Sequence, residues 1–253
     1  MLSDPACLGN LPPDAAESIF DPQFWRTRGE LSAAAAGRGS AWFIASGERQ
    51  WVLRHYRRGG FIARLSPDRY VWAGEDRVRA FAEWRLLHLM RQRGLPVPKP
   101  VAARYRRQGP WYRCDLITER IVDAEPLSSA LQRGALAESA WRAVGAAVAR
   151  LHQAGVDHAD LNAHNVLLDA DGAASVIDFD RGRLRSEGGV GAQGGGGVQG
   201  GGGVQGIWAT RNLGRLRRSL VKISRGLPAG RYSAQEWEWF MAGYGAAAGP
   251  AAA

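Results

Sequence analysis

Asp160, Asn165 and Asp178 are residues whose types and spacing suit phosphoryl transfer. Moving a γ-phosphoryl group to an alcohol requires Mg²⁺ to neutralise phosphate charge, and Mg²⁺ takes hard oxygen ligands such as a carboxylate and an amide. Asp178 and Asn165 offer those two ligand types. The reaction also needs a carboxylate that orients the acceptor hydroxyl and takes its proton, and Asp160 suits that role. We therefore predict Asp160 as the base and the other two residues as metal ligands.

A β-hairpin is expected to bring these side chains together. Residues 166–168 and 175–177 are apolar runs of strand length, and an Asp-Gly pair at 171–172 favours a tight turn between them. Asn165 would then precede the first strand and Asp178 would end the second, at one mouth of the hairpin. The alternative is a surface hairpin in which Asp and Asn only cap turns.

The order of these residues resembles the catalytic and metal-binding loops of the protein-kinase-like superfamily. The first loop reads His158-x-Asp160-x-x-x-x-Asn165, and two short predicted strands lead from it to Asp178-Phe179. The resemblance implies an α+β, bilobal protein-kinase-like fold, with a small N-terminal β-rich lobe and a larger, mainly helical C-terminal lobe.

Within that fold we expect an N-terminal arm at 1–30, a small nucleotide-binding lobe at 31–122 and a large catalytic lobe at 123–253. The arm is punctuated by Pro and Asp and is predicted to be irregular, with one short helix. Residues 122–126 resemble the hinge between kinase lobes, and adenine is expected near 119–121.

Apolar periodicity predicts helices at 77–93 and 138–153. The first is stopped by Gly94 and a following proline. The alanine- and glycine-rich end of the chain beyond Gly243 is predicted to fray.

Gly37 and Gly39 precede a predicted strand pair at 41–44 and 50–56. Glycines let backbone N–H groups approach phosphates closely, so the pair fits a phosphate-binding lid. An ordinary hairpin loop would also use them.

Arg54 occupies the strand position at which the superfamily carries a phosphate-binding lysine. Arginine is a forked, permanently charged ligand, so its geometry differs from that of lysine. Glu83, near the middle of the first predicted helix, is the candidate partner of Arg54. A solvent-facing glutamate is the alternative.

The composition is that of a globular protein with a strong positive charge: 45% of the 253 residues are hydrophobic, and the formal net charge is +9. Such a charge is compatible with anionic lipid or a multiply anionic substrate, or with solubility or general nucleic-acid affinity. The two cysteines, Cys7 and Cys114, imply no disulfide framework, and a reducing cytosol is expected. No segment approaches the roughly 20 apolar residues of a spanning helix, and the N-terminus lacks signal-peptide features.

A low-complexity tract at 188–206 repeats Gly-Gly-Gly-Gly-Val-Gln and is predicted to be a flexible insertion, expanded in a tolerant loop, with a functional lid as the alternative. After it, Leu213, Leu216, Leu220 and Ile223 form one helical stripe among basic residues. Core packing of the stripe and a solvated basic face would explain this pattern. A surface that binds anionic membranes would explain it as well. Further basic residues of that surface would be Arg57, Arg58, Arg64 and Arg69.

Longer phrases narrow the resemblance to the 3-deoxy-D-manno-octulosonic acid (Kdo) kinases. They read Gly-Arg-Gly-Ser at 37–40, Val-Leu-Arg-His-Tyr-Arg-Arg-Gly-Gly at 52–60, Leu-Pro-Val-Pro-Lys-Pro at 95–100, His-Ala-Asp-Leu-Asn-Ala-His-Asn at 158–165, and Trp208 with Asn212, Leu213, Arg215, Leu216, Arg218 and Ser219. The resemblance implies ATP- and Mg²⁺-dependent phosphorylation of the 4-hydroxyl of Kdo on Kdo-lipid A. It also implies a peripheral location on the cytoplasmic face of the bacterial inner membrane, with an anionic membrane surface and no nucleic acid as partner.

In that frame Asp160 is the base, Asn165 and Asp178 hold Mg²⁺, and Arg54, oriented by Glu83, clamps phosphate. Two departures from the wider superfamily remain: Asp180 replaces the glycine of Asp-Phe-Gly, and Asn162 replaces a lysine.

Two alternatives stay open at this point. Another lipopolysaccharide-core sugar kinase, such as a heptose kinase, would use the same loop. A catalytically silent kinase-like module would bind precursors or nucleic acid without turnover, although it would have no chemical need for all three loop residues. Aminoglycoside phosphotransfer is disfavoured, because a cationic substrate favours an acidic cleft.

Overall fold

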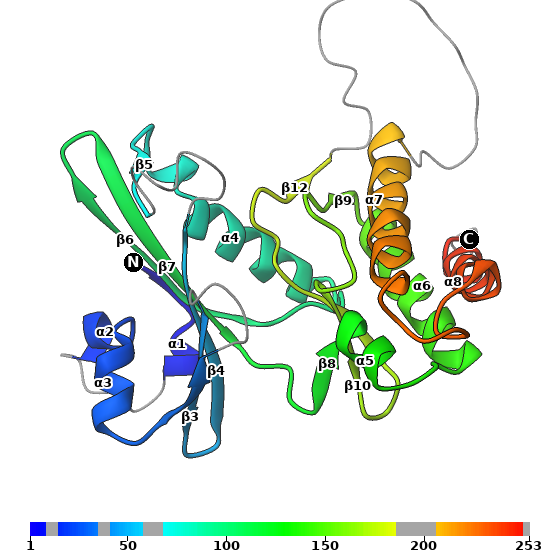
Figure 1. Ribbon diagram of the computed structural model, residues 1–253. Coiled ribbons are helices and arrows are strands. Elements are labelled where there is room, and N and C mark those ends of the chain that lie inside the picture. The colour runs from blue at the N-terminus through cyan, green and yellow to red at the C-terminus, as the bar shows by residue number, and fades with distance from the viewer. Residues whose placement is uncertain (9–14, 35–40, 58–67, 186–205, 250–253) are drawn as a thin grey trace, which may run out of the picture. The chain divides into compact units, whose positions relative to one another are not determined.

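The computed structural model describes residues 1–8, 15–34, 41–57, 68–185 and 206–249 of the chain (Figure 1). The chain divides into two compact units, Met1–Val122 and Asp123–Ala253, which are described separately below. Helices and antiparallel sheets occur in both, so the predicted α+β class is confirmed. The bilobal arrangement stays a prediction.

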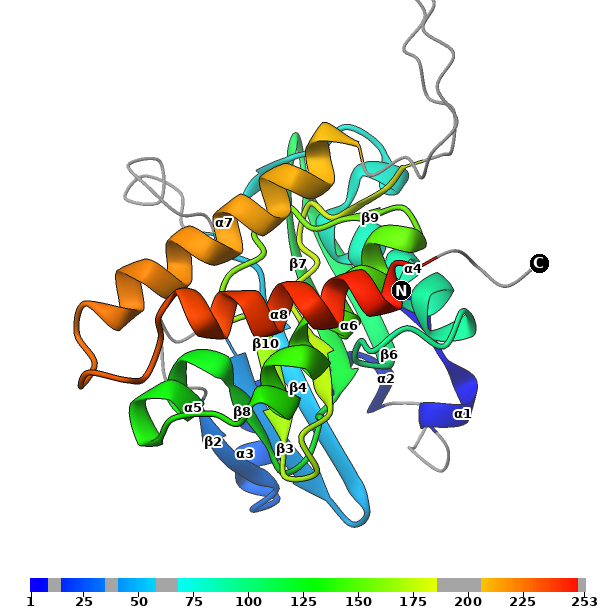
Figure 2. The ribbon, with the colours of Figure 1, turned by 90° about the vertical axis from the view of Figure 1, so that its right-hand side faces the viewer.

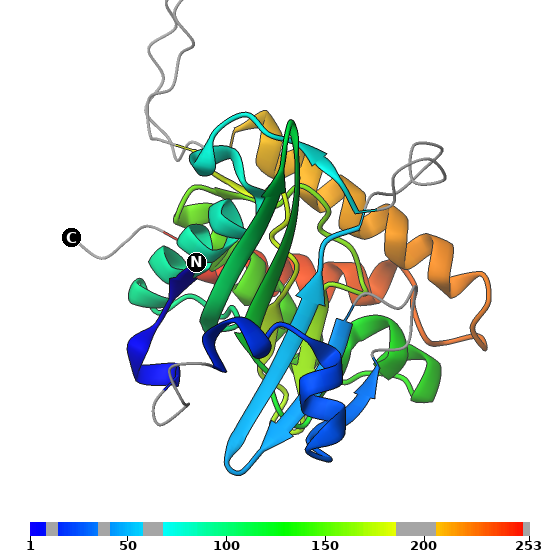
Figure 3. The same ribbon diagram turned by 90° about the vertical axis from the view of Figure 1, so that its left-hand side faces the viewer.

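The first unit is organised on a seven-stranded antiparallel sheet, visible in Figure 3, in the order β1-β6-β7-β4-β3-β2, with β5 also paired to β7. Its strands are β1 (Leu2–Ser3), β2 (Leu31–Ala34), β3 (Ala41–Ser46), β4 (Arg49–His55), β5 (Tyr70–Val71), β6 (Pro100–Gln108) and β7 (Trp111–Glu119). The predicted β3–β4 hairpin is present and turns at Gly47, whose φ of 60° lies in the left-handed region that favours glycine.

Helices of the first unit are α1 (Pro5–Leu8), α2 (Ala15–Ser18), α3 (Pro22–Thr27) and α4 (Arg79–Gln92), with a 3₁₀ turn at Glu75–Arg77. The α4 helix packs against β6 and β7 and ends before Gly94, close to its predicted bounds. Neighbouring residues of a strand face opposite sides of a sheet. Trp51 and Leu53 of β4 therefore face a core with Trp25, while Arg54 faces the other side.

The N-terminal segment is more ordered than predicted. In place of an irregular arm with one short helix, its described residues form β1, which pairs with β6, and three short helices. Trp25 is fully buried, and its indole N–H donates to the Ile19 carbonyl oxygen at 2.7 Å. The aromatic and aliphatic side chains of this segment complete the hydrophobic core of the first unit.

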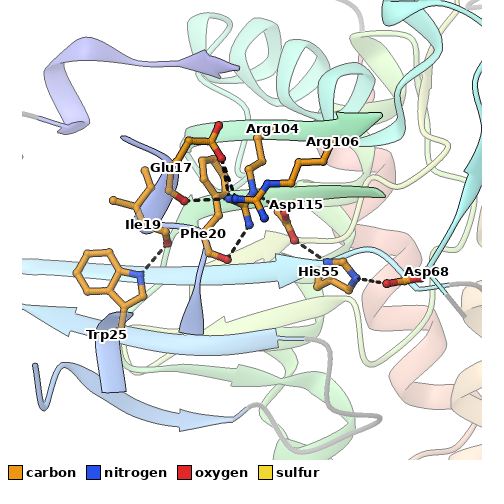
Figure 4. Close-up of polar contacts among 9 residues, drawn as sticks. All are labelled: Glu17, Ile19, Phe20, Trp25, His55, Asp68, Arg104, Arg106 and Asp115. Carbon is orange, nitrogen blue, oxygen red and sulfur yellow. Dashed lines mark hydrogen bonds and ion pairs between the residues drawn. The ribbon is translucent and has the colours of Figure 1, made fainter. Parts of the chain in front are cut away.

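Arg104 of β6 fastens this segment to the sheet (Figure 4). Only 6% exposed, it donates to the Asp115 carboxylate at 2.8 Å and to the Glu17 carboxylate at 3.0 Å. It also donates to the carbonyl oxygens of Glu17 and Phe20 at 2.9 and 3.2 Å. A buried charge is tolerated only when it is paired and hydrogen-bonded, and Arg104 meets that condition by recruiting the N-terminal segment.

The second unit contains a three-stranded sheet in the order β11-β10-β8 and a two-stranded sheet of β12 and β9. Its elements are β8 (Ala124–Pro126), α5 (Leu127–Arg133), α6 (Glu138–Gln153), β9 (Val156–Asp157), β10 (Val166–Asp169), β11 (Ala174–Val176), β12 (Arg183–Leu184), α7 (Ile207–Ser224) and α8 (Ala234–Ala247). The bounds predicted for α6 from its apolar periodicity are those observed.

Helices α6 and α8 cross in close contact (Figure 2). A Cβ atom added at Gly145 would lie 2.7 Å from the Tyr244 backbone nitrogen, and one at Gly243 would lie 2.6 Å from the Arg142 carbonyl carbon. The prediction of a frayed end beyond Gly243 is wrong as far as Ala247, where α8 ends, and residues 250–253 lie outside the described part of the chain. Tyr244 is buried and bonds to His152 Nδ1 at 2.8 Å.

Replacing Arg104 by alanine should destabilise the protein by about 3 kcal/mol, because it leaves Asp115 buried without its arginine. The matched Arg106→Ala change, which removes an exposed pair with Glu17, should cost less than about 1 kcal/mol. Urea unfolding of both variants measures the difference. Equal losses would contradict the role given to Arg104.

Gly145→Ala should destabilise the protein by about 2 kcal/mol or more, because the new methyl group would clash with the backbone of α8 and overpacking is costly. Gly245→Ala, in α8 with nothing within 4 Å, should instead stabilise by up to about 1 kcal/mol through helix propensity. Thermal unfolding of the two variants tests the close crossing, which would be refuted if Gly145→Ala were neutral.

Candidate active site

The predicted hairpin is confirmed in the second unit. Strands β10 and β11 pair with Val166 opposite Val176, and the turn contains Gly172 at φ 80°. Beyond the paired strands, the Ile177 N–H donates to the Asn165 carbonyl oxygen at 2.9 Å. Asn165 and the neighbouring Asp178 therefore lie at the same end of the hairpin, as predicted.

His158 connects the loop before β10 to the end of β11. The imidazole is 1% exposed and packs against the Phe179 ring, with centroids 4.7 Å apart. Nε2 lies 2.9 Å from the Ile177 carbonyl oxygen, and Nδ1 lies 3.1 Å from the Asp160 backbone nitrogen. A carbonyl oxygen can only accept and a backbone N–H can only donate, so this geometry assigns the neutral tautomer with its proton on Nε2.

The backbone of Asp160 is fixed while its side chain stays accessible. The Asp160 carbonyl oxygen accepts the amide N–H groups of Asn162 and Asn165, each at 3.0 Å. The Asn162 side-chain oxygen in turn accepts the His164 N–H at 2.8 Å. Asp160 itself is exposed, so an acceptor hydroxyl can reach its carboxylate. Asn162, which replaces a superfamily lysine, therefore acts as a loop brace that the sequence motif did not reveal.

Asn165 and Asp178 present a donor set that fits Mg²⁺. Because the Asn165 amide nitrogen donates to the Asp160 backbone, its oxygen is the atom that can ligate a cation. Asp178 adopts φ 65°, a left-handed conformation that Asp tolerates better than most residues and that is common at functional sites. No group of three or more His, Cys, Asp or Glu side chains gathers as a metal site among the described residues. Mg²⁺ is commonly held by one or two protein oxygens together with phosphates and water, so Asn165 and Asp178 would be a sufficient protein contribution.

The predicted partnership of Arg54 and Glu83 is confirmed within the first unit. The Arg54 guanidinium on β4 forms an ion pair with the Glu83 carboxylate on α4, and Glu83 is only 3% exposed. The alternative of a solvent-facing Glu83 is therefore wrong. Whether this pair serves a nucleotide stays a prediction.

Tyr56 is a third member of this cluster that the sequence analysis did not identify. Its hydroxyl donates to the same Glu83 carboxylate, and the Arg54 guanidinium carbon lies 4.8 Å from the centre of its ring. Burial, reinforced by the Glu83 charge, raises the pKa of Tyr56 well above its ordinary value, so the phenol stays a donor. Its position two residues after Arg54, on the same strand face, was the available signal.

Gly37 and Gly39, the predicted phosphate lid, lie outside the described residues, as does the glycine tract up to residue 205.

A loop held by a buried histidine and carrying an aspartate, followed by a hairpin that leads to Asp-Phe, is the arrangement predicted for a phosphotransferase of the protein-kinase-like class. Comparison with known families agrees: the chain matches the lipopolysaccharide kinase (Kdo/WaaP) family over residues 22–191. The chain belongs to this family and is a kinase.

Several relatives are similar along most of their length. A protein of Stenotrophomonas maltophilia (strain K279a) is 44% identical over 210 residues, which cover 83% of this chain and 76% of the relative. A protein of Xanthomonas euvesicatoria pv. vesicatoria (strain 85-10) is 45% identical over 212 residues, with the same coverage. One of Xanthomonas oryzae pv. oryzae (strain PXO99A) is 43% identical over 227 residues, 88% of this chain and 82% of the relative. All three are named 3-deoxy-D-manno-octulosonic acid kinase.

Histidine titration by NMR should separate the buried His158 from His55. Burial lowers the pKa of His158 and lowers that of His152 to about 4, whereas the hydrogen bond to Asp115 raises the pKa of His55. His55 should thus titrate above about 6.5 and the other two below it. Because unfolding lets His158 take up a proton, its contribution to stability should be lost as the pH falls below about 6.5. A His158 that becomes charged above pH 7 would contradict the assigned tautomer.

Proposed function

We propose that this kinase transfers the γ-phosphoryl group of ATP to the 4-hydroxyl of Kdo on Kdo-lipid A, in the synthesis of the lipopolysaccharide core. The observation that carries the proposal is the loop geometry, in which an exposed Asp160 stands on a backbone fixed by His158 and Asn165. The names of the relatives supply the acceptor class.

Each residue has a distinct task in the proposed reaction. Asp160 accepts a hydrogen bond from the acceptor hydroxyl, orients its oxygen toward the γ-phosphorus and takes the proton as the new O–P bond forms. Asn165 and Asp178 would hold Mg²⁺, which would neutralise phosphate charge. Arg54, held by Glu83, binds a phosphate of the nucleotide. Gly37 and Gly39, outside the described residues, stay the predicted phosphate lid. ADP is the leaving group.

We further propose that the protein works as a peripheral protein at the cytoplasmic face of the inner membrane. Within the described part of the chain, no helix is both long and apolar enough to cross a bilayer. On α7, Leu216 and Leu220 of the predicted stripe are buried in the core, Leu213 and Ile223 are partly buried, and the exposed face carries basic residues. These exposed residues are Arg211, Arg217, Arg218 and Lys222, and Arg225 follows the helix. Anionic headgroups would attract such a face.

Phosphate transfer from labelled ATP to Kdo-lipid A tests the reaction. Wild type should label Kdo-lipid A but not lipid A that lacks Kdo, and excess chelator should abolish the signal. Asp160→Asn keeps the backbone bonds of the loop but removes the base, so kcat should fall by about 10²–10⁴-fold. Heptosylated lipid A without Kdo serves as the rival acceptor.

The matched control is Asp171→Asn, an exposed turn position where Asn-Gly suits the hairpin as well as Asp-Gly. It should retain wild-type kcat. Labelling of the heptosylated acceptor alone would replace the Kdo assignment with a heptose kinase, and ATP binding without transfer to either acceptor would favour a silent module.

A further inference from the structure

A small basic pocket lies beside the catalytic loop within the second unit. It has a volume of about 250 Å³. Five arginines line it, namely Arg181, Arg183, Arg185, Arg211 and Arg215. Three follow the Asp-Phe motif, and two come from the first half of α7. None of these arginines was predicted to be a catalytic, nucleotide-binding or metal-binding residue.

Strand β9 brings the two groups of arginines together, because both β12 and helix α7 contact it. Strand β12 pairs with β9, which places Arg183 opposite Asp157, and the Arg185 N–H donates to the Gly155 carbonyl oxygen at 2.7 Å. Helix α7 packs on β9, and the two elements lie near each other in Figures 1 and 2. Arg211 and Arg215 of α7 thereby line the same pocket as the arginines around β12. Arg181 adopts φ 62°, an uncommon conformation for arginine that is often retained at functional sites.

The pocket has a large excess of positive charge. Among the described residues that line it, Asp157 is the one acidic residue, and Arg185 pairs with it at 2.6 Å. Arg215 donates to a main-chain oxygen, that of His158, at 3.3 Å. Within the ranges that the structure describes, Arg181, Arg183 and Arg211 have no ion pair. Like charges gathered in a small concave site repel one another, and a bound anion would relieve that repulsion.

One buried polar atom at the pocket also lacks a partner. Asn212 lines the pocket, and its amide nitrogen donates to Asp157 at 3.0 Å and to the Trp208 carbonyl oxygen at 3.1 Å. These two bonds fix the orientation of the amide. Its oxygen is buried without a hydrogen-bond partner among the described residues. An unsatisfied buried acceptor calls for a donor, such as a ligand hydroxyl.

The pocket adjoins the candidate base. Ala159 lines it, and Ala159 precedes Asp160, so their Cα atoms are about 3.8 Å apart. We propose that this arginine pocket binds an anionic group of the acceptor, a carboxylate or a phosphate, and so positions the hydroxyl that is phosphorylated. Guanidinium forks match the paired oxygens of both anions. The inference rests on the proposed function for the identity of the acceptor.

The test compares a pocket variant with a variant of equal charge elsewhere in the same unit. Arg183→Ala/Arg211→Ala removes two exposed pocket arginines, and Arg133→Ala/Arg142→Ala removes two exposed arginines outside it. For the pocket variant, the KM for Kdo-lipid A should rise at least about tenfold, since loss of even one charge-assisted hydrogen bond has an effect of that size. The KM for ATP should not change, and the control should match wild type.

Three acceptors identify the anion: the native glycolipid, its Kdo methyl ester, and a form lacking the lipid A phosphates. The difference between pocket variant and wild type should disappear for the acceptor that lacks the bound group. A KM for the acceptor that is unchanged, or raised equally in both variants, would overturn the inference.

Calorimetric titration of the native glycolipid without ATP separates this inference from the proposed reaction. Binding that only the pocket variant weakens supports the pocket, even if wild type transfers no phosphate. Turnover by wild type together with equal binding by all three proteins would reject the pocket and leave the reaction standing.

Discussion

The neutral imidazole of His158 is the constraint on which the candidate active site depends. A single buried ring accepts from the backbone of Asp160 and donates to that of Ile177, so the loop with the base and the strand that leads to Asp178 share one support. A charged imidazolium could not accept from Asp160, and burial disfavours that form. The ring can therefore brace both segments only while it stays neutral, and Phe179 helps by covering it.

Two kinds of arginine can be distinguished in the chain, those in ion pairs that hold elements together and those that line the basic pocket. Arg104 and Arg54 are both engaged by carboxylates on neighbouring elements, so each contributes to the packing of the first unit. Arg183 and Arg211 form no ion pair among the described residues, although the charge of Arg211 helps to lower the pKa of Asp157. A net charge of +9 destabilises a compact chain through self-repulsion, and an anionic substrate or surface would offset part of that cost. Concentrating unpaired arginines beside the catalytic loop makes the substrate the natural counter-charge.

The elements predicted correctly are those whose signals lie within a short stretch of sequence. The α6 helix has an unbroken apolar periodicity, and the β10–β11 hairpin has an Asp-Gly turn between two apolar runs, so both were found. Contacts distant in sequence explain the failures. The N-terminal segment is ordered by Arg104, which lies 87 positions after Glu17, and α8 persists beyond Gly243 because that glycine lets it approach α6. Nothing in either segment alone signals these partners.

The arginine at position 54 shows how a departure from a motif can be accommodated. A lysine would offer one compact ammonium group to a glutamate, whereas a guanidinium is broad, planar and always charged. In this chain the Glu83 carboxylate receives both Arg54 and the Tyr56 hydroxyl, and the Tyr56 ring lies beneath the guanidinium. Arg54, Tyr56 and Glu83 thus form one cluster, in which the tyrosine ring contacts the flat face of the guanidinium. Restoring the superfamily lysine at this position would remove the planar stacking on the Tyr56 ring and the forked donors that one guanidinium offers to both Glu83 and the Tyr56 hydroxyl, so the familiar residue is the disruptive one here.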